Sequence, residues 1–321
     1  MYGLNTKMID KDKLISESLD FAFSNSDVKK LSYFKDPKLS EGHVLLEIKD
    51  DQIFVLNSHK SIDDLRLKAF GSFLLNIING LNINCRFILN TRDENSSMGF
   101  STFQFSKKEN NSNHITVLDP HYILRYINYK PNDQKQFKDK KNKIVFRGTD
   151  TGCYPNPFKN ERIQLSKEAF EKPWADIKIS NFLFYDKESL NNFKIEQDQI
   201  KGDFLDFSQQ SENKFIADIY GHTVAWDRNI WAMGLNSILL KLHLFEKDKI
   251  HLWYSKFLDD YDIVPNLFFK DLENFITLTP ENKLLKILEK QLNFSTIINN
   301  RSTHEEYMQK VLIKYNEIYN R

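Results

Sequence analysis

The hydrophobic positions in the first third of the chain switch between helical and strand-like spacing. Residues 8–23 and 65–81 repeat apolar side chains as an amphipathic helix does. Residues 42–56 alternate as strand, turn and strand, and residues 85–90 form a short apolar run that reads as a buried strand. This run ends on the polar turn Thr91-Arg92-Asp93. The pattern predicts an α/β fold, in which the turn after a strand is where open sheets carry their chemistry.

The second half of the chain shows the same alternation. Its expected strands are residues 143–146 and 177–179, and residues 250–254 form a further short apolar segment. Its expected helices are residues 228–240 and 267–276, followed by two helices within residues 282–321. Because strand and helix signals alternate on both sides of the stretch around residue 140, we expect two α/β halves.

A polar stretch separates the two halves. Residues 130–143 are almost entirely polar and charged and include Pro131, which favours a linker or a solvated loop. A chain of 321 residues also exceeds the comfortable size of one hydrophobic core. We therefore expect one α/β domain over residues 1–140 and a second over residues 141–299.

The charge balance and the cysteine content narrow the function classes. With 45 basic and 44 acidic residues the formal net charge is +1, so no global field favours nucleic acid or an anionic membrane, and any anion site must be local. Cys85 and Cys153 are too few for a disulfide framework, which suits a reducing compartment. Residues 1–20 lack the apolar core of a signal peptide, and no stretch approaches the ~18 apolar residues of a membrane span. We expect a cytoplasmic protein.

Two segments combine arginine and glycine in a way that suits a phosphate-bearing ligand. The first is the turn Arg147-Gly148-Thr149 after an expected strand, with Arg162 a little downstream. The second segment contains Lys214, Gly221, Arg228, Ser237 and Lys241. Glycine lets a ligand approach the backbone closely, and a guanidinium group binds phosphate oxygens through parallel hydrogen bonds. Together the segments look like the two halves of a nucleotide-sugar site.

These segments resemble glycosyltransferase family 90, which includes protein O-glucosyl- and O-xylosyltransferases, capsule xylosyltransferases and bacterial surface-glycan enzymes. The motifs that carry the resemblance are Asn90-Thr91-Arg92-Asp93, Phe146-Arg147-Gly148-Thr149, Lys214-Phe215 through Gly221, Arg228 with Ser237 and Lys241, and Trp253-Tyr254 through Val264-Pro265. They occur in the family's order and span roughly residues 87–275. The chain departs from the family at Asp227, Asn236 and Leu252, where a small residue, glycine and an acidic residue are usual.

The resemblance implies a GT-B-like α/β fold, in which two Rossmann-like domains face each other across a cleft. It implies an inverting transfer of glucose or xylose from a UDP-sugar co-substrate, without a metal or another cofactor. Asp93 matches the family's general base, with Glu94 and Asp119 as the nearest alternatives. Arg147 and Arg228 match donor-binding positions that offset the growing charge on UDP. The other donor-binding residues that it implies are Gly148, Thr149, Arg162, Lys214, Gly221 and Ser237.

The expected acceptor is a hydroxyl of a surface glycan or glycolipid, such as a lipopolysaccharide or capsule precursor. On this reading residues 1–140 form the acceptor side, residues 141–299 bind the UDP-sugar, and the enzyme works in the cytoplasm or peripherally at the inner membrane face. In two-lobed transferases a C-terminal helix often crosses back onto the first lobe, so residues 300–321 are a candidate for packing there. The donor sugar stays open, because glucose and xylose differ by one hydroxymethyl group that no motif reports.

Other readings of the same residues stay open. Arg92-Asp93 also suits an ordinary exposed turn, and Arg228 also suits pairing with a nearby carboxylate such as Asp218 on a helix surface. Asp260 and Asp262 resemble a metal clamp, but no apolar strand precedes them, which favours a solvated loop. The alternative functions are a non-catalytic nucleotide-sugar-binding protein and a protein O-glycosyltransferase. We expect no nucleic-acid partner, because the Lys-rich stretch around residue 137 is broken by acidic residues.

Overall fold

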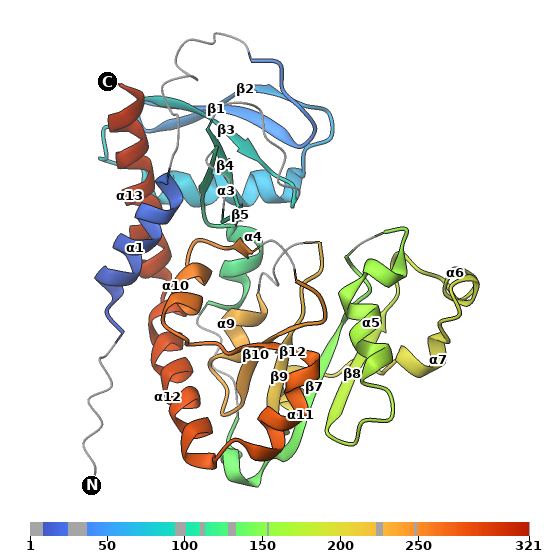
Figure 1. Ribbon diagram of the computed structural model, residues 1–321. Coiled ribbons are helices and arrows are strands. Elements are labelled where there is room, and N and C mark those ends of the chain that lie inside the picture. The colour runs from blue at the N-terminus through green and yellow to red at the C-terminus, as the bar shows by residue number, and fades with distance from the viewer. Residues whose placement is uncertain are drawn as a thin grey trace, which may run out of the picture. The chain divides into compact units, whose positions relative to one another are not determined.

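The chain folds into two compact units (Figure 1). The computed structural model describes residues 9–24, 37–93, 101–109, 113–127, 133–152, 154–222, 227–246 and 249–320. The first unit is built from residues 1–127, 248–257 and 300–321, and the second from residues 128–247 and 258–299. The chain thus leaves the first unit earlier than the boundary expected after residue 140, and it returns to that unit twice.

The first unit is a mixed α/β structure around a five-stranded sheet in the order β2-β1-β3-β4-β6. Its strands are β1 (His43–Lys49), β2 (Gln52–Ser58), β3 (Cys85–Asn90), β4 (Thr102–Gln104) and β6 (His114–Thr116). β1 is antiparallel to β2 and β3, whereas β3, β4 and β6 run parallel. A separate pair, β5 (Lys107–Lys108) with β11 (Ile250–His251), joins the returning chain to this unit. The expected strand-turn-strand and the expected strand at residues 85–90 are confirmed.

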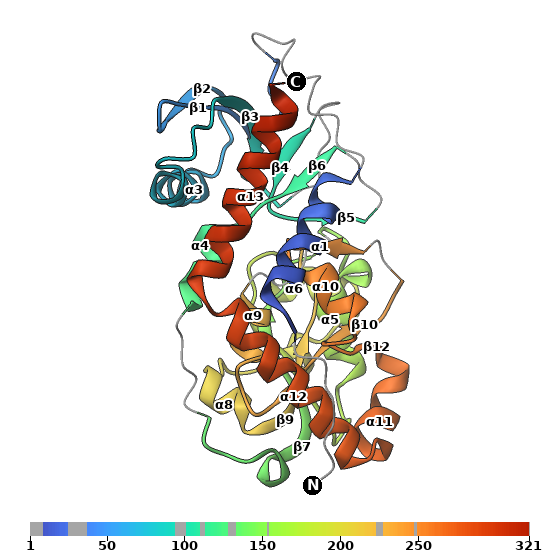
Figure 2. The same cartoon turned by 90° about the vertical axis from the view of Figure 1, so that its left-hand side faces the viewer.

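The helices of the first unit are α1 (Lys11–Phe23), α3 (Asp64–Ile77), α4 (Pro120–Ile123) and α13 (Arg301–Tyr319). α13 packs Tyr315 edge-on against Phe87 of β3 and Phe103 of β4, with ring centroids 6.2 Å and 4.9 Å apart. The Tyr315 hydroxyl donates to the Arg86 carbonyl (2.8 Å). α1 lies beside α13 in both views (Figures 1 and 2). The C-terminal helix therefore belongs to the first unit, and the helices expected near residues 8–23 and 65–81 are confirmed.

The second unit is an α/β structure around a parallel five-stranded sheet. Its strands are β7 (Lys141–Thr149), β8 (Ala175–Asn181), β9 (Asn213–Asp218), β10 (Ile238–His243) and β12 (Asn266–Phe268). They lie in the order β12-β10-β9-β7-β8, so the first strand in the chain lies between the second and the third. The strand order therefore reverses between β7 and β9, as in doubly wound α/β folds.

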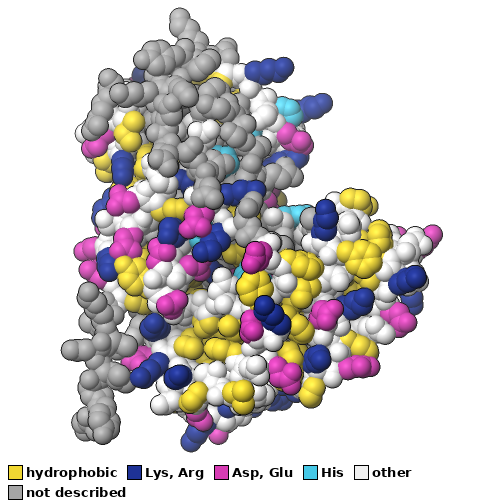
Figure 3. All heavy atoms as spheres, in the orientation of Figure 1, with side chains coloured by type: hydrophobic (Ala, Val, Ile, Leu, Met, Phe, Trp, Pro, Cys, Tyr) yellow, Lys and Arg dark blue, Asp and Glu magenta, His cyan; other side chains and the backbone are white. Residues whose placement is uncertain are grey.

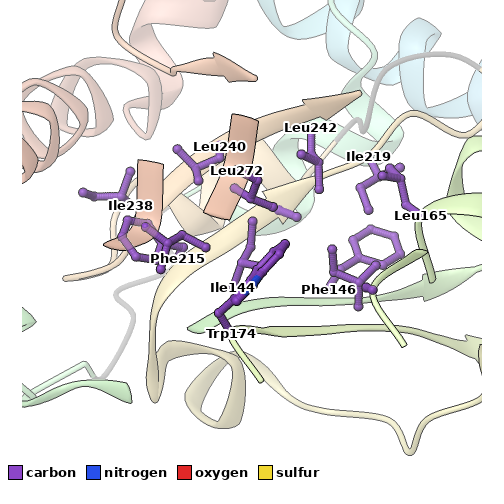
Figure 4. Packing of buried hydrophobic residues seen from close by; sticks show 14 of the residues in the cluster. Ile144, Phe146, Leu165, Trp174, Phe215, Ile219, Ile238, Leu240, Leu242 and Leu272 are labelled. Atoms are coloured by element: carbon purple, nitrogen blue, oxygen red, sulfur yellow. The ribbon is translucent and has the colours of Figure 1, made fainter. Parts of the chain in front are cut away.

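Helices cover this sheet and bury a large apolar core against it (Figure 4). The helices of the second unit include α5 (Glu161–Glu168), α6 (Lys187–Asn192), α7 (Gln197–Ile200), α8 (Phe207–Ser211), α9 (Arg228–Ala232), α11 (Phe269–Leu278) and α12 (Glu281–Ile298). Ile144 and Phe146 of β7 and Phe215 of β9 share one cluster with Leu165 of α5 and Leu272 of α11. Strands that are covered in this way read as nearly continuous apolar runs in the sequence.

The continuous apolar sequence of covered strands explains where the sequence predictions fail. The helix expected at residues 228–240 is wrong, because this segment forms the short helix α9 and then the strand β10. Ile238, Leu239 and Leu240 are all fully buried, and over so short a window a buried strand cannot be told from a buried helix. The short apolar segment at residues 250–254 contains the two-residue strand β11 and is followed by α10 (Ser255–Asp260). The helix expected at residues 267–276 corresponds to α11, which begins at Phe269 because the residues before it form β12.

The surface carries mixed charge. Basic and acidic side chains alternate over the coloured part of the face seen in Figure 3, in keeping with a net charge of +1. Large hydrophobic side chains also reach solvent in the second unit, among them Tyr154, Leu183 and Phe204. Among the helices of the described residues, none is both long enough and apolar enough to cross a membrane.

Candidate functional site

The reversal point between β7 and β9 is where a sheet of this order is expected to bind a ligand, outside the carboxyl ends of the strands. β7 ends at Thr149 and β9 at Asp218. α5 begins close to the end of β7, because its N-cap Asn160 donates from Nδ2 to the Asp150 carbonyl (2.7 Å). Arg162 in the first turn of α5 is thereby brought to the same edge of the sheet.

Two guanidinium groups share the ring of Phe146. The Cζ atom of Arg228 lies 4.7 Å from the ring centroid and that of Arg162 lies 5.5 Å from it. Phe146 is fully buried in the core, so its ring is a fixed support. Gly148 leaves room for the ring, because a Cβ atom at this position would lie 2.6 Å from Cζ of Phe146. The segment Phe146-Arg147-Gly148 thus builds a platform for both guanidinium groups, within the range of cation–π attraction.

Arg162 is held by contacts that leave one of its nitrogen atoms unused. It donates from Nε to the Ile219 carbonyl (3.1 Å), and from Nη1 to the Thr149 carbonyl (3.1 Å) and to Thr151 Oγ1 (2.5 Å). Within the described part of the chain, no acceptor binds its Nη2 atom. Gly221 keeps space beside that atom, because a Cβ atom at Gly221 would lie 3.1 Å from Nη2 and 2.7 Å from Thr151 Oγ1.

Arg228 is held in a similar way. Its Nη2 atom donates to the Arg147 carbonyl (2.7 Å) and its Nη1 atom to Gln210 Oε1 (3.3 Å). None of the residues that the structure describes accepts a hydrogen bond from its Nε atom. Both arginines are half-buried and keep a donor for a ligand, whereas their other donors fix the orientation of the planar groups.

The electrostatics of this edge favour an anionic ligand. Burial, and then the charge of Arg228, lower the pKa of Arg162 to about 10. Burial also lowers the pKa of Arg228, although the carboxylate of Asp218 opposes this. Asp218 itself is fully buried, which raises its pKa against the charges of its basic neighbours. Lys241 on β10 forms an ion pair with Asp259. A ligand with two negative charges would offset the repulsion between the two arginines.

Aromatic rings border the arginine pair. The carboxylate of Asp150 is fully buried and accepts hydrogen bonds from three successive backbone N–H groups, those of residues 183–185, at 2.8–3.0 Å. This fixes the turn after β8. The ring of Phe184 in that turn lies 5.3 Å from His222 and 5.9 Å from Tyr154. Tyr154 is 60% exposed and Phe184 is 39% exposed, so these rings present an aromatic surface to solvent next to the glycine turn after β9.

Arg147 does not join the arginine pair. It donates from Nε to the Asp203 carbonyl, from Nη1 to the carbonyls of Phe146 and Asp176, and from Nη2 to the Asp176 carboxylate, each at 2.9 Å. Its side chain therefore links β7 to β8, and only its backbone carbonyl reaches Arg228. The sequence pairs Arg147 with Arg228 at the ligand, whereas the structure pairs Arg162 with Arg228.

Two further expected donor-binding residues lie at the amino ends of their strands, away from the reversal point. Lys214 is the second residue of β9, and its Nζ atom lies 5.2 Å from the centroid of the Phe137 ring. Ser237 directly precedes β10 and is fully buried. It donates to the Asn213 carbonyl (2.8 Å) and accepts from Lys140 Nζ (2.9 Å). Ser237 thus links the starts of β9 and β10, Lys214 packs on Phe137, and the structure does not bring either residue to the arginine pair.

Asp93, the expected base, belongs to an ion-pair cluster of the first unit. Its Oδ1 atom lies 2.5 Å from Nη1 of Arg66, and Nε of Arg66 lies 3.1 Å from Oδ2 of Asp119. Arg66 is 3% exposed and Asp119 is fully buried. Burial raises the pKa of Asp119 to about 7, although Arg66 lowers it. Asp93 is therefore more than an ordinary exposed turn residue.

Sequence reasoning missed Arg66 and the role of Asp150. Arg66 lies in the first turn of an amphipathic helix, where nothing in the local sequence distinguishes it from a solvated basic residue. Asp150 directly follows β7, and its place at the carboxyl end of a strand was the available signal. Cys153, Trp226 and the alternative base Glu94 lie outside the described residues.

The aspartates that resemble a metal clamp lie on one short segment. Asp260 ends α10, and Asp262 follows in a turn with a positive φ of 48°. In the part of the chain that the structure describes, no group of three or more His, Cys, Asp or Glu side chains is placed to hold a metal ion. The neighbouring Asp259 pairs with Lys241, so this segment contributes to the electrostatics of β10.

Comparison with known proteins adds no family. No protein-family model matches the chain, and no curated protein is significantly similar to it. The features of the chain that bear on function are therefore the arginine pair, the aromatic rings beside it and the Asp93 cluster.

Proposed function

We propose that the protein is an inverting glycosyltransferase that transfers glucose or xylose from a UDP-sugar to a hydroxyl of a surface glycan or glycolipid, such as a lipopolysaccharide or capsule precursor. Arg162 and Arg228 of the second unit bind the diphosphate, and Asp93 of the first unit is the general base. The UDP-sugar is a co-substrate, and no metal or other cofactor takes part. A GT-B-like pairing of two Rossmann-like domains and work at the inner membrane face belong to the same proposal.

The observation that carries the proposal is the arginine pair on Phe146. Each guanidinium group is fixed by backbone carbonyls and keeps a donor that no described residue binds. Hydrogen bonds from guanidinium to phosphate oxygens are among the strong ones, and partial burial strengthens them further. Such groups offset the charge that develops on the departing diphosphate, which is the role a metal ion plays elsewhere.

The aromatic surface beside the pair supports a nucleotide rather than a simple phosphate. Tyr154 and Phe184 expose their rings next to His222, which follows Gly221. Stacking of a base on an aromatic ring contributes about 1–3 kcal/mol. A uracil base on these rings and a diphosphate on the arginines would use the two halves of the site together.

The reaction itself needs one carboxylate. In a single displacement the acceptor hydroxyl gives its proton to Asp93, its oxygen forms a bond to the anomeric carbon, and the bond from that carbon to UDP breaks. The electron pair of the broken bond goes to the diphosphate, where Arg162 and Arg228 offset it.

One observation favours a second candidate, a nucleotide-sugar-binding protein without catalysis. Oδ1 of Asp93 is ion-paired with Arg66, so this oxygen is already engaged within the protein and is not open to an acceptor hydroxyl. A protein O-glycosyltransferase would differ from the proposed enzyme only in its acceptor.

A panel of ligands in thermal unfolding tests the donor first. UDP, UDP-glucose and UDP-xylose should each raise the free energy of unfolding, by about 2.7 kcal/mol at a hundredfold excess over the dissociation constant. Inorganic pyrophosphate should have a smaller effect, because it cannot use the aromatic rings. If no UDP-sugar stabilises the protein, the proposal fails. Release of UDP without acceptor, in the presence of EDTA, then separates the enzyme from the binding protein.

A further inference from the structure

Arg66 connects three chain segments of the first unit at one point. It lies in the first turn of α3, where the N-cap Asp63 accepts hydrogen bonds from the backbone N–H groups of Leu65 and Arg66. The N–H group of Asp63 in turn donates to Thr91 Oγ1 (2.8 Å), which ties α3 to the end of β3. Arg66 Nη1 donates to the Thr91 carbonyl (3.1 Å). Asp119, the third partner, is the N-cap of α4 just after β6.

The guanidinium plane of Arg66 is fixed on all sides. Its Cζ atom lies 4.8 Å from the ring centroid of Tyr122 and 5.6 Å from that of Phe105. In this orientation it binds Oδ1 of Asp93 on one side and Oδ2 of Asp119 on the other. Among the described residues, the ion pair of Asp93 is made through Oδ1, and its side chain is 29% exposed, which leaves Oδ2 for an acceptor. The cluster therefore holds one oxygen of Asp93 and presents the other.

We propose that Arg66 and Asp119 are positioning residues for Asp93. Arg66 holds Oδ1 so that Oδ2 of Asp93 receives the proton of the acceptor hydroxyl, and Asp119 offsets the charge of Arg66 while Asp93 is neutral. This inference rests on the proposed role of Asp93 as the general base.

Charge balance explains why the second carboxylate matters. With Asp119 ionised, Arg66 keeps a partner when Asp93 takes up a proton. Without Asp119, the full charge of Arg66 would act on Asp93 alone and would oppose proton uptake. Burial raises the pKa of Asp119 to about 7, so a proton can be held within the cluster near neutral pH. The other titratable or charged groups beside the cluster are Asp63 of α3, His121 and Tyr122 of α4, and Arg125 after it.

The test is Asp119→Asn in the full chain, which keeps the shape and the helix cap and removes the charge. The carboxyl carbon of Asp93 is followed by NMR over pH in protein labelled at its aspartate carboxyl groups, with Asp93→Asn used to assign the signal. In the wild type we expect the Asp93 signal to show a step near pH 7, where the charge of Asp119 changes, and in Asp119→Asn we expect this step to be absent. The change of kcat near the same pH should be lost as well, with an unchanged KM for the UDP-sugar.

Two further variants separate positioning from a merely structural role. Glu47→Gln removes a carboxylate that pairs with Arg86 between β1 and β3 of the same unit, and we expect it to leave the Asp93 titration unchanged. Arg66→Lys keeps the positive charge but loses the planar guanidinium group that contacts Asp93 and Asp119 together. Because Asp93 is then less well oriented, we expect kcat to fall up to about 100-fold at constant KM.

An Asp93 titration and a kcat profile that are the same in Asp119→Asn and in the wild type would overturn the inference. The NMR titration needs no activity, so it decides the coupling even if no sugar is transferred. Loss of the step near pH 7 in a protein that binds UDP but transfers no sugar would support the coupling within the cluster and contradict the proposed transferase activity. If Arg66→Lys does not fold, the isosteric Asp119→Asn still carries the test.

Discussion

Arginine is used in opposite ways in the two units. In the first unit the guanidinium of Arg66 is buried between two carboxylates, so the protein itself offsets its charge. In the second unit Arg162 and Arg228 share one ring and each keeps a donor that no described residue binds. A closed ion-pair cluster fixes geometry, whereas a fixed but incompletely paired group is suited to bind a ligand. The partners of an arginine, more than its place in a motif, indicate its role.

The largest expected effect concerns Asp93, the carboxylate of the Arg66 cluster that we propose as the general base. Asp93→Asn keeps the shape of the side chain and removes its ability to accept a proton. Transfer of sugar from the donor should fall by about 10²–10⁴-fold, the usual contribution of a positioned base. UDP affinity, measured by calorimetry on the same sample, should stay at the wild-type value because Asp93 belongs to the first unit. Transfer at a near wild-type rate would move the role of base to Asp119 or to Glu94.

The next largest effect concerns the arginines that keep a donor. Arg162→Ala and Arg228→Ala should each weaken UDP binding by about 2–5 kcal/mol where the charge is desolvated. Arg147→Ala is the matched control, because the fork of Arg147 is engaged with Asp176 and with the Asp203 carbonyl. We expect it to lower the free energy of unfolding and to change UDP affinity much less. If calorimetry shows that Arg147→Ala loses more UDP affinity than Arg162→Ala and Arg228→Ala, Arg147 rather than the arginine pair binds the ligand.

Several strands of both sheets could be predicted, because a buried strand is strongly apolar in sequence. Residues 85–90 become β3 with the expected bounds, and residues 143–146 lie inside β7. The same apolar signal gave the wrong element type at β10, where Ile238, Leu239 and Leu240 are apolar at successive positions and a helix was expected. A strand covered on both faces has no alternation to distinguish it from a helix. The mixed α/β class was therefore accessible from the sequence, whereas the type of one short element was not.

For the candidate site, the sequence brought several of its residues to one edge of the sheet but did not reveal their partners. Arg147, Gly148 and Arg228 were named from the sequence, and all are near the reversal point between β7 and β9. Which guanidinium faces a ligand depends on the side of β7 from which each residue projects and on contacts across the sheet. Arg147 meets Asp176 of β8, and Arg66 meets Asp119 more than fifty residues later in the chain. Local sequence carries no record of such distant pairs.

A smaller effect tests the space beside Arg162. Gly221→Ala places a Cβ atom 2.7 Å from Thr151 Oγ1 and 3.1 Å from Nη2 of Arg162. We expect a loss of about 1–3 kcal/mol in the free energy of unfolding, together with weaker UDP binding, since the unused donor is crowded. Gly71→Ala on α3 is the matched control, because a Cβ atom there meets nothing within 4 Å, and it should stabilise the helix by up to about 1 kcal/mol. Equal UDP affinity in both variants would show that Nη2 does not contact the ligand.

The last prediction distinguishes the two clusters by the pH at which each changes charge. Burial raises the pKa of Asp119 from an ordinary 3.8 to about 7, so its contribution to stability is complete below about pH 4 and is lost as the pH rises through 7. The free energy of unfolding of the wild type should therefore fall relative to that of Asp119→Asn between pH 4 and pH 7, by at most ~1.4 kcal/mol per pH unit. Urea unfolding of both proteins at several pH values measures this difference. Parallel curves would mean that Asp119 does not titrate there. A falling difference would place a titrating proton in the Arg66 cluster near neutral pH, whereas the pKa of Arg162, at about 10, leaves that guanidinium charged over the same range.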